Sequence, residues 1–141
     1  MSIQAVLLPV FVQVGLTFFL LFWMASVRTS SIRRGVVKIR DIALRQPAWP
    51  ERETKIGNAF HSQLEVPILF YVLVVLALNA RKADLLSVIM SWLFVASRFV
   101  HAFIHTGSNN VPRRFYAYAF GVIVLLLMWI IFAVRVLLGL G

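Results

Sequence analysis

The residues from Ile3 to Val27 contain no charged side chain, and this apolar run constrains the fold more than any other feature. A helix rises about 1.5 Å per residue, so the run is long enough to cross a hydrocarbon core of about 30 Å. No basic segment precedes it, and it is longer than the apolar part of a secretory signal. We therefore expect a membrane-spanning helix here rather than a cleaved signal.

Three further apolar segments follow, at about residues 58–78, 85–106 and 115–134. Hydrophobic residues make up 61% of the 141 residues and charged residues only 13%. A soluble domain of this size cannot bury so much apolar surface in its own core. We therefore expect an all-α membrane protein, a single domain over residues 1–141 in which four transmembrane helices form a bundle.

The longest polar segment is the connection between the first two spans, residues 28–57. It holds eight Lys or Arg residues and the helix-breaking sequence Gln46-Pro47-Ala48-Trp49-Pro50. Part of it, from Ile32 to Leu44, could form an amphipathic helix that lies at the membrane interface. We thus expect a long basic loop with some interfacial structure.

The distribution of basic residues predicts how the chain is oriented. Four spans place the first and third loops on the same side, and these loops carry ten Lys or Arg residues, eight in 28–57 plus Arg113 and Arg114. The second loop carries two. The positive-inside rule then places loops 28–57 and 107–114 in the cytoplasm and both termini outside.

The formal net charge of +9 raises the question of a nucleic-acid partner. Most of the basic residues lie beside apolar segments, where topology and anionic lipid headgroups account for them. We therefore expect membrane lipids as partners and no nucleic acid. The sequence has no cysteine, which excludes disulfides and thiolate metal sites.

Polar residues inside membrane spans are energetically costly and mark functional positions. The second span carries Asn58, His61, Ser62 and Glu65, and the third span carries Arg98, His101 and His105. Within each span these polar residues are three, four or seven positions apart, a spacing that predicts one shared helical face. By helix geometry, Glu65 and Arg98 should both lie roughly 10 Å inside the cytoplasmic boundary. Arg28 ends the first span at that side, and basic residues begin the fourth. This convergence favours a solvated ligand site over a single ion pair that fastens two helices.

Two sequence motifs carry a resemblance to a known family. One is Glu65-Val66-Pro67-Ile68-Leu69-Phe70; the other is Arg98-Phe99-Val100-His101-Ala102-Phe103-Ile104-His105, followed by Asn109 and then Arg114-Phe115. Their order and the four-span pattern resemble the MAPEG family, the membrane-associated proteins of eicosanoid and glutathione metabolism. Residues 63–73 and 92–115 look especially like a bacterial branch. The resemblance implies a homotrimer in a bacterial inner membrane, with glutathione held between subunits and open to the cytoplasm.

The resemblance also implies roles for individual residues. Arg114 sits where the family's thiolate-stabilising arginine opens the fourth helix, and a nearby guanidinium does favour a thiolate. Arg28 and Arg98 match basic residues that bind carboxylates or brace the site. Glu65 would accept from the glutathione amine or steady an arginine. The other expected glutathione-binding residues are Asn58, His61, Ser62, His101, His105 and Asn109. The implied activity is that of a glutathione S-transferase or peroxidase acting on hydrophobic electrophiles.

Three positions depart from the family pattern, and other functions stay open. Asn58 stands where several eukaryotic members have arginine, Ser62 where many have asparagine, and His105 where active members have a ligand-contacting tyrosine. The same basic pocket could instead bind a lipid or small anion without catalysis. A metal site is a further alternative, because His61 and Glu65, like His101 and His105, have the i, i+4 spacing of helical metal ligands. The charge of Arg98 opposes a divalent metal.

Overall fold

The computed structural model describes residues 2–43 and 49–139, and within these ranges the chain is helical and contains no strand. The helices are α1 (Ile3–Arg33), α2 (Ile39–Ile42), α3 (Glu51–Ser62), α4 (Val66–Asn79), α5 (Leu85–Thr106) and α6 (Val111–Leu137). Four units are long and apolar enough to cross a membrane: α1, α3 together with α4, α5, and α6. The predicted all-α bundle with four spans is confirmed.

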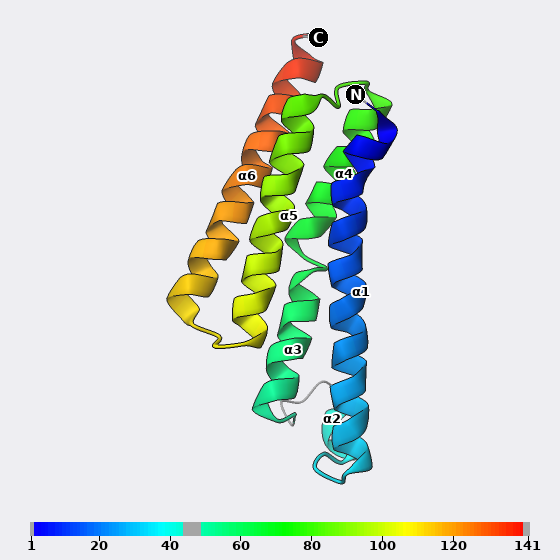
Figure 1. The fold of residues 1–141 in the computed structure, drawn as a ribbon, viewed down its shortest axis with the longest axis vertical. Helices are drawn as coiled ribbons and strands as arrows, with labels where there is room; N and C mark the ends of the chain where they lie inside the picture. The colour runs from blue at the N-terminus through cyan, green and yellow to red at the C-terminus, as the bar shows by residue number, and fades with distance from the viewer. Residues whose placement is uncertain (1, 44–48, 140–141) are drawn as a thin grey trace.

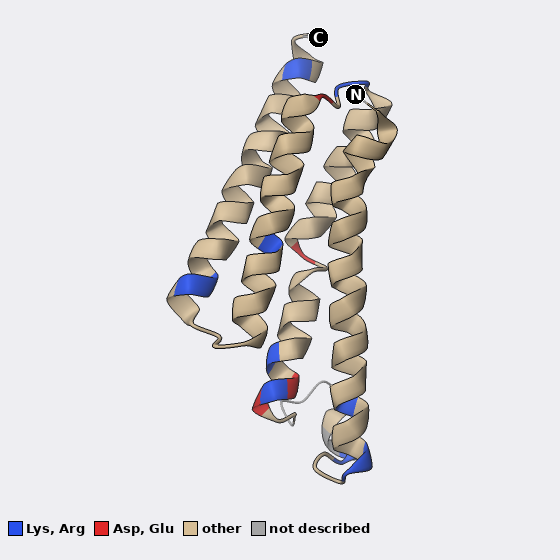
Figure 2. Cartoon of the chain, viewed as in Figure 1, with Lys and Arg blue, Asp and Glu red and all other residues tan. Residues whose placement is uncertain are grey.

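The spans lie side by side along one long axis, with both termini at one end of the bundle (Figure 1). The α1–α3 connection and the α5–α6 turn lie towards the opposite end. Lys and Arg residues occur towards both ends of the bundle and at one level along α5 (Figure 2). Large apolar side chains such as Phe11, Phe22 and Phe103 are exposed on the outside, as a lipid-facing surface requires. Which end faces the cytoplasm stays a prediction.

Several helices extend beyond the predicted spans. α1 continues to Arg33, α3 begins at Glu51, and α6 begins at Val111, against predicted limits of 3–27, 58–78 and 115–134. The extensions have local causes: Glu51 and Glu53 lie favourably in the first turn of α3, and the Asn110 side chain accepts a hydrogen bond from the first turn of α6. Apolar runs mark the hydrocarbon core, whereas helices continue into the headgroup region.

The interfacial helix predicted for residues 32–44 is wrong over most of its length. α1 ends at Arg33, Gly35 adopts a left-handed φ of +74°, and only the four-residue α2 follows. A left-handed residue terminates a helix, and glycine adopts that conformation without steric cost. Leu44, the last residue of the predicted helix, lies outside the described residues.

The second span, predicted to be one helix, is interrupted at residues 63–65 (Figure 1). Pro67 has no N–H, and its ring disfavours a helical carbonyl four residues earlier, at Gln63. Glu65 takes a non-helical conformation, with φ −102° and ψ −100°, and α4 starts at the next residue. The break gives α3 a C-terminus in the interior of the bundle.

The apolar core lies mainly on the terminal side of this break. Phe70 of α4 and Phe94 of α5 are fully buried, with ring centroids 4.9 Å apart. Further along α5, at Ser97, α5 and α6 approach closely: a Cβ added at Gly121 of α6 would lie 2.5 Å from the Ser97 Oγ. A small residue at a membrane helix contact permits this approach. The close α5–α6 pair holds the polar residues of both helices in register.

At the terminal end, Asp84 joins the start of α5 to the end of α6. Its Oδ1 accepts from the Ser87 N–H at 3.0 Å, and its Oδ2 accepts from Arg135 Nη1 at 2.6 Å. Partial burial by itself would raise the pKa of Asp84, but the hydrogen bonds from Ser87 and Arg135 and the charge of Arg135 lower it below its ordinary 3.8. The carboxylate form therefore stabilises this end of the fold.

Asp84→Asn tests this linkage, since asparagine also caps helices and removes only the charge. Because the folded-state pKa is lowered, the contribution is present above 3.8 and is lost as pH falls through the folded value. Asp84 is partly exposed, so we expect a stability difference below about 1 kcal/mol. The melting-temperature gap to wild type should be constant from neutral pH to about pH 5 and shrink below about pH 4. A gap that does not change with pH would contradict the charge contribution.

Candidate functional site

Arg98 of α5 lies in the interior, with 2% of its surface exposed. Its Nη2 donates to the Ser62 carbonyl at 3.1 Å and to the Ser62 Oγ at 2.6 Å, and its Nε donates to Gln63 Oε1 at 3.4 Å. These acceptors lie at the C-terminus of α3, where the helix dipole carries partial negative charge. The guanidinium is therefore accommodated by the helix end that the break creates.

Arg98 does not form an ion pair with Glu65. Glu65 is exposed, and the ion pairs found between described residues are Lys55–Glu51 and Arg135–Asp84. The idea that the two residues simply fasten two helices is thus contradicted, and the break explains why. A continuous helix would place Glu65 beside Ser62, but the non-helical turn directs it outward.

Two glutamines that sequence analysis did not single out complete this network. Gln13 of α1 and Gln63 are 0% and 1% exposed, and Gln13 Nε2 donates to Gln63 Oε1 at 2.8 Å. Gln63 Nε2 in turn donates to the Ala59 carbonyl at 2.9 Å. An amide inside the long apolar run of α1 is itself a signal of interhelical bonding, because lipid contact there would be costly.

His101 and His105 continue the polar region along α5. They are 4% and 8% exposed, with ring centroids 5.4 Å apart, and Tyr118 of α6 lies 5.6 Å from the His101 ring. The Arg98 guanidinium lies 5.8 Å from the same tyrosine ring. Among the described residues, both histidine Nδ1 atoms are buried without a hydrogen-bond partner. Such atoms are rare in native interiors and usually meet a ligand or an ordered water.

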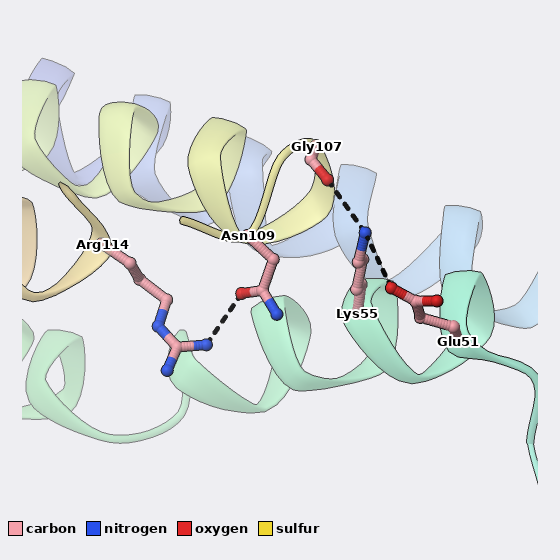
Figure 3. A network of polar contacts seen from close by, with 5 residues as sticks. All are labelled: Glu51, Lys55, Gly107, Asn109 and Arg114. Carbon is pink, nitrogen blue, oxygen red and sulfur yellow. Dashed lines mark hydrogen bonds and ion pairs between the residues drawn. The ribbon is translucent and has the colours of Figure 1, made fainter. Parts of the chain in front are cut away.

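Arg114 lies at the start of α6 and is held by the preceding turn (Figure 3). Its Nη1 donates to Asn109 Oδ1 at 2.8 Å. Asn109 has φ +51°, a left-handed conformation that asparagine tolerates better than most residues, and its N–H closes α5 on the Ile104 carbonyl at 2.7 Å. Asn109 therefore orients Arg114, and the ligand-binding role expected for Asn109 stays a prediction.

Lys55 ties α3 to the same turn. Its Nζ donates to the Gly107 carbonyl at 3.1 Å and lies 3.3 Å from Glu51 Oε1, as Figure 3 shows. Gly107 caps the C-terminus of α5, so the lysine also meets the negative end of that helix. The turn that carries Asn109 is thus attached to α3.

The polar face predicted for the second span is not a single face. Ser62 is buried against Arg98, whereas Asn58, His61 and Glu65 are exposed. The interruption after Ser62 separates Glu65 from α3, and α3 itself packs with its Ser62 side inward. Within one chain, the predicted residues of this span therefore lie in two different environments, through the orientation of α3 for Asn58 and His61 and through the break for Glu65.

Arg28 lies in the seam between α1 and α3. Its guanidinium carbon is 4.8 Å from the centroid of the Trp49 ring, and a Cβ added at Gly57 would lie 2.8 Å from its Nη2. Its Nε is buried and has no hydrogen-bond partner in the part of the chain that the structure describes. The cation is held by packing and retains an unused donor.

The comparison with family models now decides the identity of the fold. The MAPEG family model matches residues 6–134. The chain belongs to the MAPEG family. No curated protein and no solved structure matches it. The match and the four spans make this MAPEG protein an integral, multi-pass membrane protein.

In this MAPEG protein, the interior polar region is cationic. Arg98, His101, His105 and Tyr118 are joined by ring and cation contacts. Within the described residues, 2–43 and 49–139, there is no group of three or more His, Cys, Asp or Glu side chains that could hold a metal ion. The two i, i+4 pairs of the second and third spans are therefore not brought together. The chemistry of the cluster suits an anionic ligand.

Proposed function

We propose that this MAPEG protein binds glutathione and acts as a glutathione S-transferase or peroxidase on hydrophobic electrophiles. The observation that carries the proposal is the buried histidine pair with unpartnered Nδ1 atoms, which follows the buried Arg98 along α5. A ligand with carboxylates and a weakly acidic thiol complements such a site. The apolar exterior lets a membrane-dissolved electrophile reach it.

In this proposal Arg114 stabilises the glutathione thiolate, and Asn109 holds the guanidinium in place. Arg28 offers its unused Nε to a carboxylate, while His101 and His105 supply hydrogen bonds through Nδ1. In conjugation, the sulfur forms a C–S bond and the leaving group departs with the bonding electrons. In peroxide reduction, the sulfur takes one oxygen as the O–O bond breaks, and a second glutathione completes reduction to disulfide, alcohol and water.

We also propose that the protein is a homotrimer. Asn58, His61 and Glu65 are exposed on the α3–α4 span, and an exposed carboxylate within a membrane span is costly against lipid. A second copy that covers this surface removes that cost and places Glu65 beside a ligand held between subunits. We place the trimer in a bacterial inner membrane, with loops 28–57 and 107–114 in the cytoplasm, following their basic charge.

Calorimetry with glutathione tests the proposed function in the detergent-solubilised protein. Wild type should release or absorb heat on binding, and Arg114→Ala should lower the affinity about tenfold or more, since hydrogen bonds to charged groups are the strong ones. Ultraviolet absorbance of the bound thiolate should disappear in the same variant.

Arg113→Ala is the matched control, because Arg113 is exposed and the charge change is equal. It should bind like wild type. Negligible heat with the wild-type protein would remove glutathione from the proposal. Binding without conversion of a generic thiol-accepting electrophile would instead support the non-catalytic alternative, in which the pocket holds a lipid or small anion.

A further inference from the structure

A cavity lies at the terminal end of the bundle, between the end of α4, the start of α5 and the end of α6 (Figure 1). Its volume is about 30 Å³. Apolar side chains form most of its wall: Leu73 and Val74 of α4, Met90 of α5, and Met128 and Phe132 of α6. The histidine pair lies in the last two turns of α5, at the other end, so the cavity is separate from the proposed glutathione site.

This cavity suits part of a hydrocarbon chain. Its serines are already bonded: the Ser91 hydroxyl donates to the Ser87 carbonyl at 2.8 Å, and the Ser87 N–H donates to Asp84 Oδ1 at 3.0 Å. An apolar cavity stays dry, and one that takes a benzene ring measures about 150 Å³, so this cavity is too small for a ring. Leu86, which also lines it, is exposed on the lipid-facing surface. A chain from the surrounding membrane can therefore reach it.

Positive charge gathers at the same end of the bundle (Figure 2). Lys82 and Arg135 line the cavity, and Arg81 is exposed next to Lys82 in the α4–α5 turn. Among the described residues, the acidic side chain at this end is Asp84, which accepts from Arg135 Nη1 at 2.6 Å. Three cations thus stand against one carboxylate, so this end of the bundle attracts anions.

The backbone of Arg81 indicates that its side chain has a use beyond the turn. Its φ is +57°, in the left-handed region. The Arg81 N–H donates to the Leu78 carbonyl at 3.2 Å, and the Lys82 N–H donates to the Ala77 carbonyl at 2.8 Å. These two bonds form a Schellman motif, which favours glycine at the position that Arg81 occupies. A strained residue in place of glycine points to a function for the side chain.

We propose that the cavity and the cations beside it form a binding site for an anionic phospholipid of the surrounding membrane. The phosphate accepts hydrogen bonds from Arg81 and Lys82 at the membrane surface, and part of one acyl chain lies in the cavity. The excess of positive charge selects the anionic head, and the narrow apolar cavity selects a chain. The site is independent of glutathione and of the proposed function.

A photoactivatable phosphatidylglycerol, with a diazirine in one acyl chain, tests the site in the detergent-solubilised protein. Cross-linked peptides, identified by mass spectrometry, should come from the cavity-lining parts of α4, α5 and α6. Unlabelled phosphatidylglycerol should compete. Phosphatidylcholine with the same chains has no net charge and should compete about fivefold less well, the effect of one Lys or Arg near an anionic headgroup. Glycerol phosphate, which has no chain, should not compete.

Arg81→Gly is the decisive variant, because glycine adopts the left-handed conformation without steric cost. The melting temperature in lipid-free detergent should stay unchanged or rise, whereas cross-linking in the cavity should fall about fivefold at limiting phosphatidylglycerol. An arginine that serves only the turn would give the first result without the second. Arg113→Ala removes an exposed arginine at the other end of the bundle and, as the matched control, should cross-link like wild type.

Ala77→Val tests the contribution of the chain, because it adds two methyl groups at the cavity wall and leaves every charge in place. Cross-linking in the cavity should fall in this variant too. Wild-type cross-linking in either Arg81→Gly or Ala77→Val would overturn the proposal. Equal competition by phosphatidylcholine, competition by glycerol phosphate, or cross-links confined to the outer faces of the spans would do the same.

Discussion

Arg98→Met should destabilise the protein by about 2–4 kcal/mol, because it leaves the Ser62 hydroxyl and carbonyl without their buried donor. The C-terminus of α3 loses the cation that offsets its dipole, and Gln63 loses one of its two donors. Denaturant or thermal unfolding in detergent, followed by helical circular dichroism, measures the change. The same variant should bind glutathione more weakly, since the histidine pair loses its neighbour.

Arg98→Lys is the control for charge. Lysine keeps the positive charge but lacks the planar fork that reaches Ser62 and Gln63 together, so we expect an intermediate loss. A methionine variant as stable as wild type would show that the network does not contribute to the fold. A lysine variant equal to wild type would show that charge alone is sufficient.

Gly121→Val should have the second large effect, at the contact between α5 and α6. The first added atom would lie 2.5 Å from Ser97 Oγ, and further methyl groups would meet the Phe94 ring at the same contact. Overpacking of this kind costs about 1–3 kcal/mol and separates the two helices. The expected results are a lower melting temperature and weaker glutathione binding, because Tyr118 and Arg114 move with α6.

Two further variants test whether the close α5–α6 contact is the cause of the destabilisation expected for Gly121→Val. Gly121→Ala alone should lower the stability, and combining it with Ser97→Ala should restore the stability. Without the Ser97 hydroxyl, the atom nearest to the added Cβ would be the Cβ of residue 97 at 3.5 Å, an ordinary contact. Gly15→Ala, where an added Cβ meets nothing within 4 Å, should leave stability unchanged or slightly raised. If Ser97→Ala gives no recovery, the close approach of α5 and α6 is not the reason for glycine at 121.

Much of the site could be predicted because polar residues inside apolar runs are rare and costly. Arg98, His101 and His105 share one helical face by spacing, and they are buried together. Asn109 and Arg114 are five residues apart around a turn and are hydrogen bonded. The prediction of one polar face for Asn58, His61, Ser62 and Glu65 was wrong, because only Ser62 is buried and the spacing to Glu65 assumes a continuous helix.

The sequence by itself determined the four spans, because a bilayer leaves a long apolar segment few choices besides a helix that satisfies its own backbone. It also determined that Arg98, His101 and His105 share one face of the third span, whereas Gln13 and Gln63 were not singled out. The tertiary structure alone decided their partners: Pro67 breaks the span, and Gln13 from a distant segment meets Gln63 at the break. Such pairing depends on how side chains from separate helices pack, and no periodicity along one helix encodes that contact.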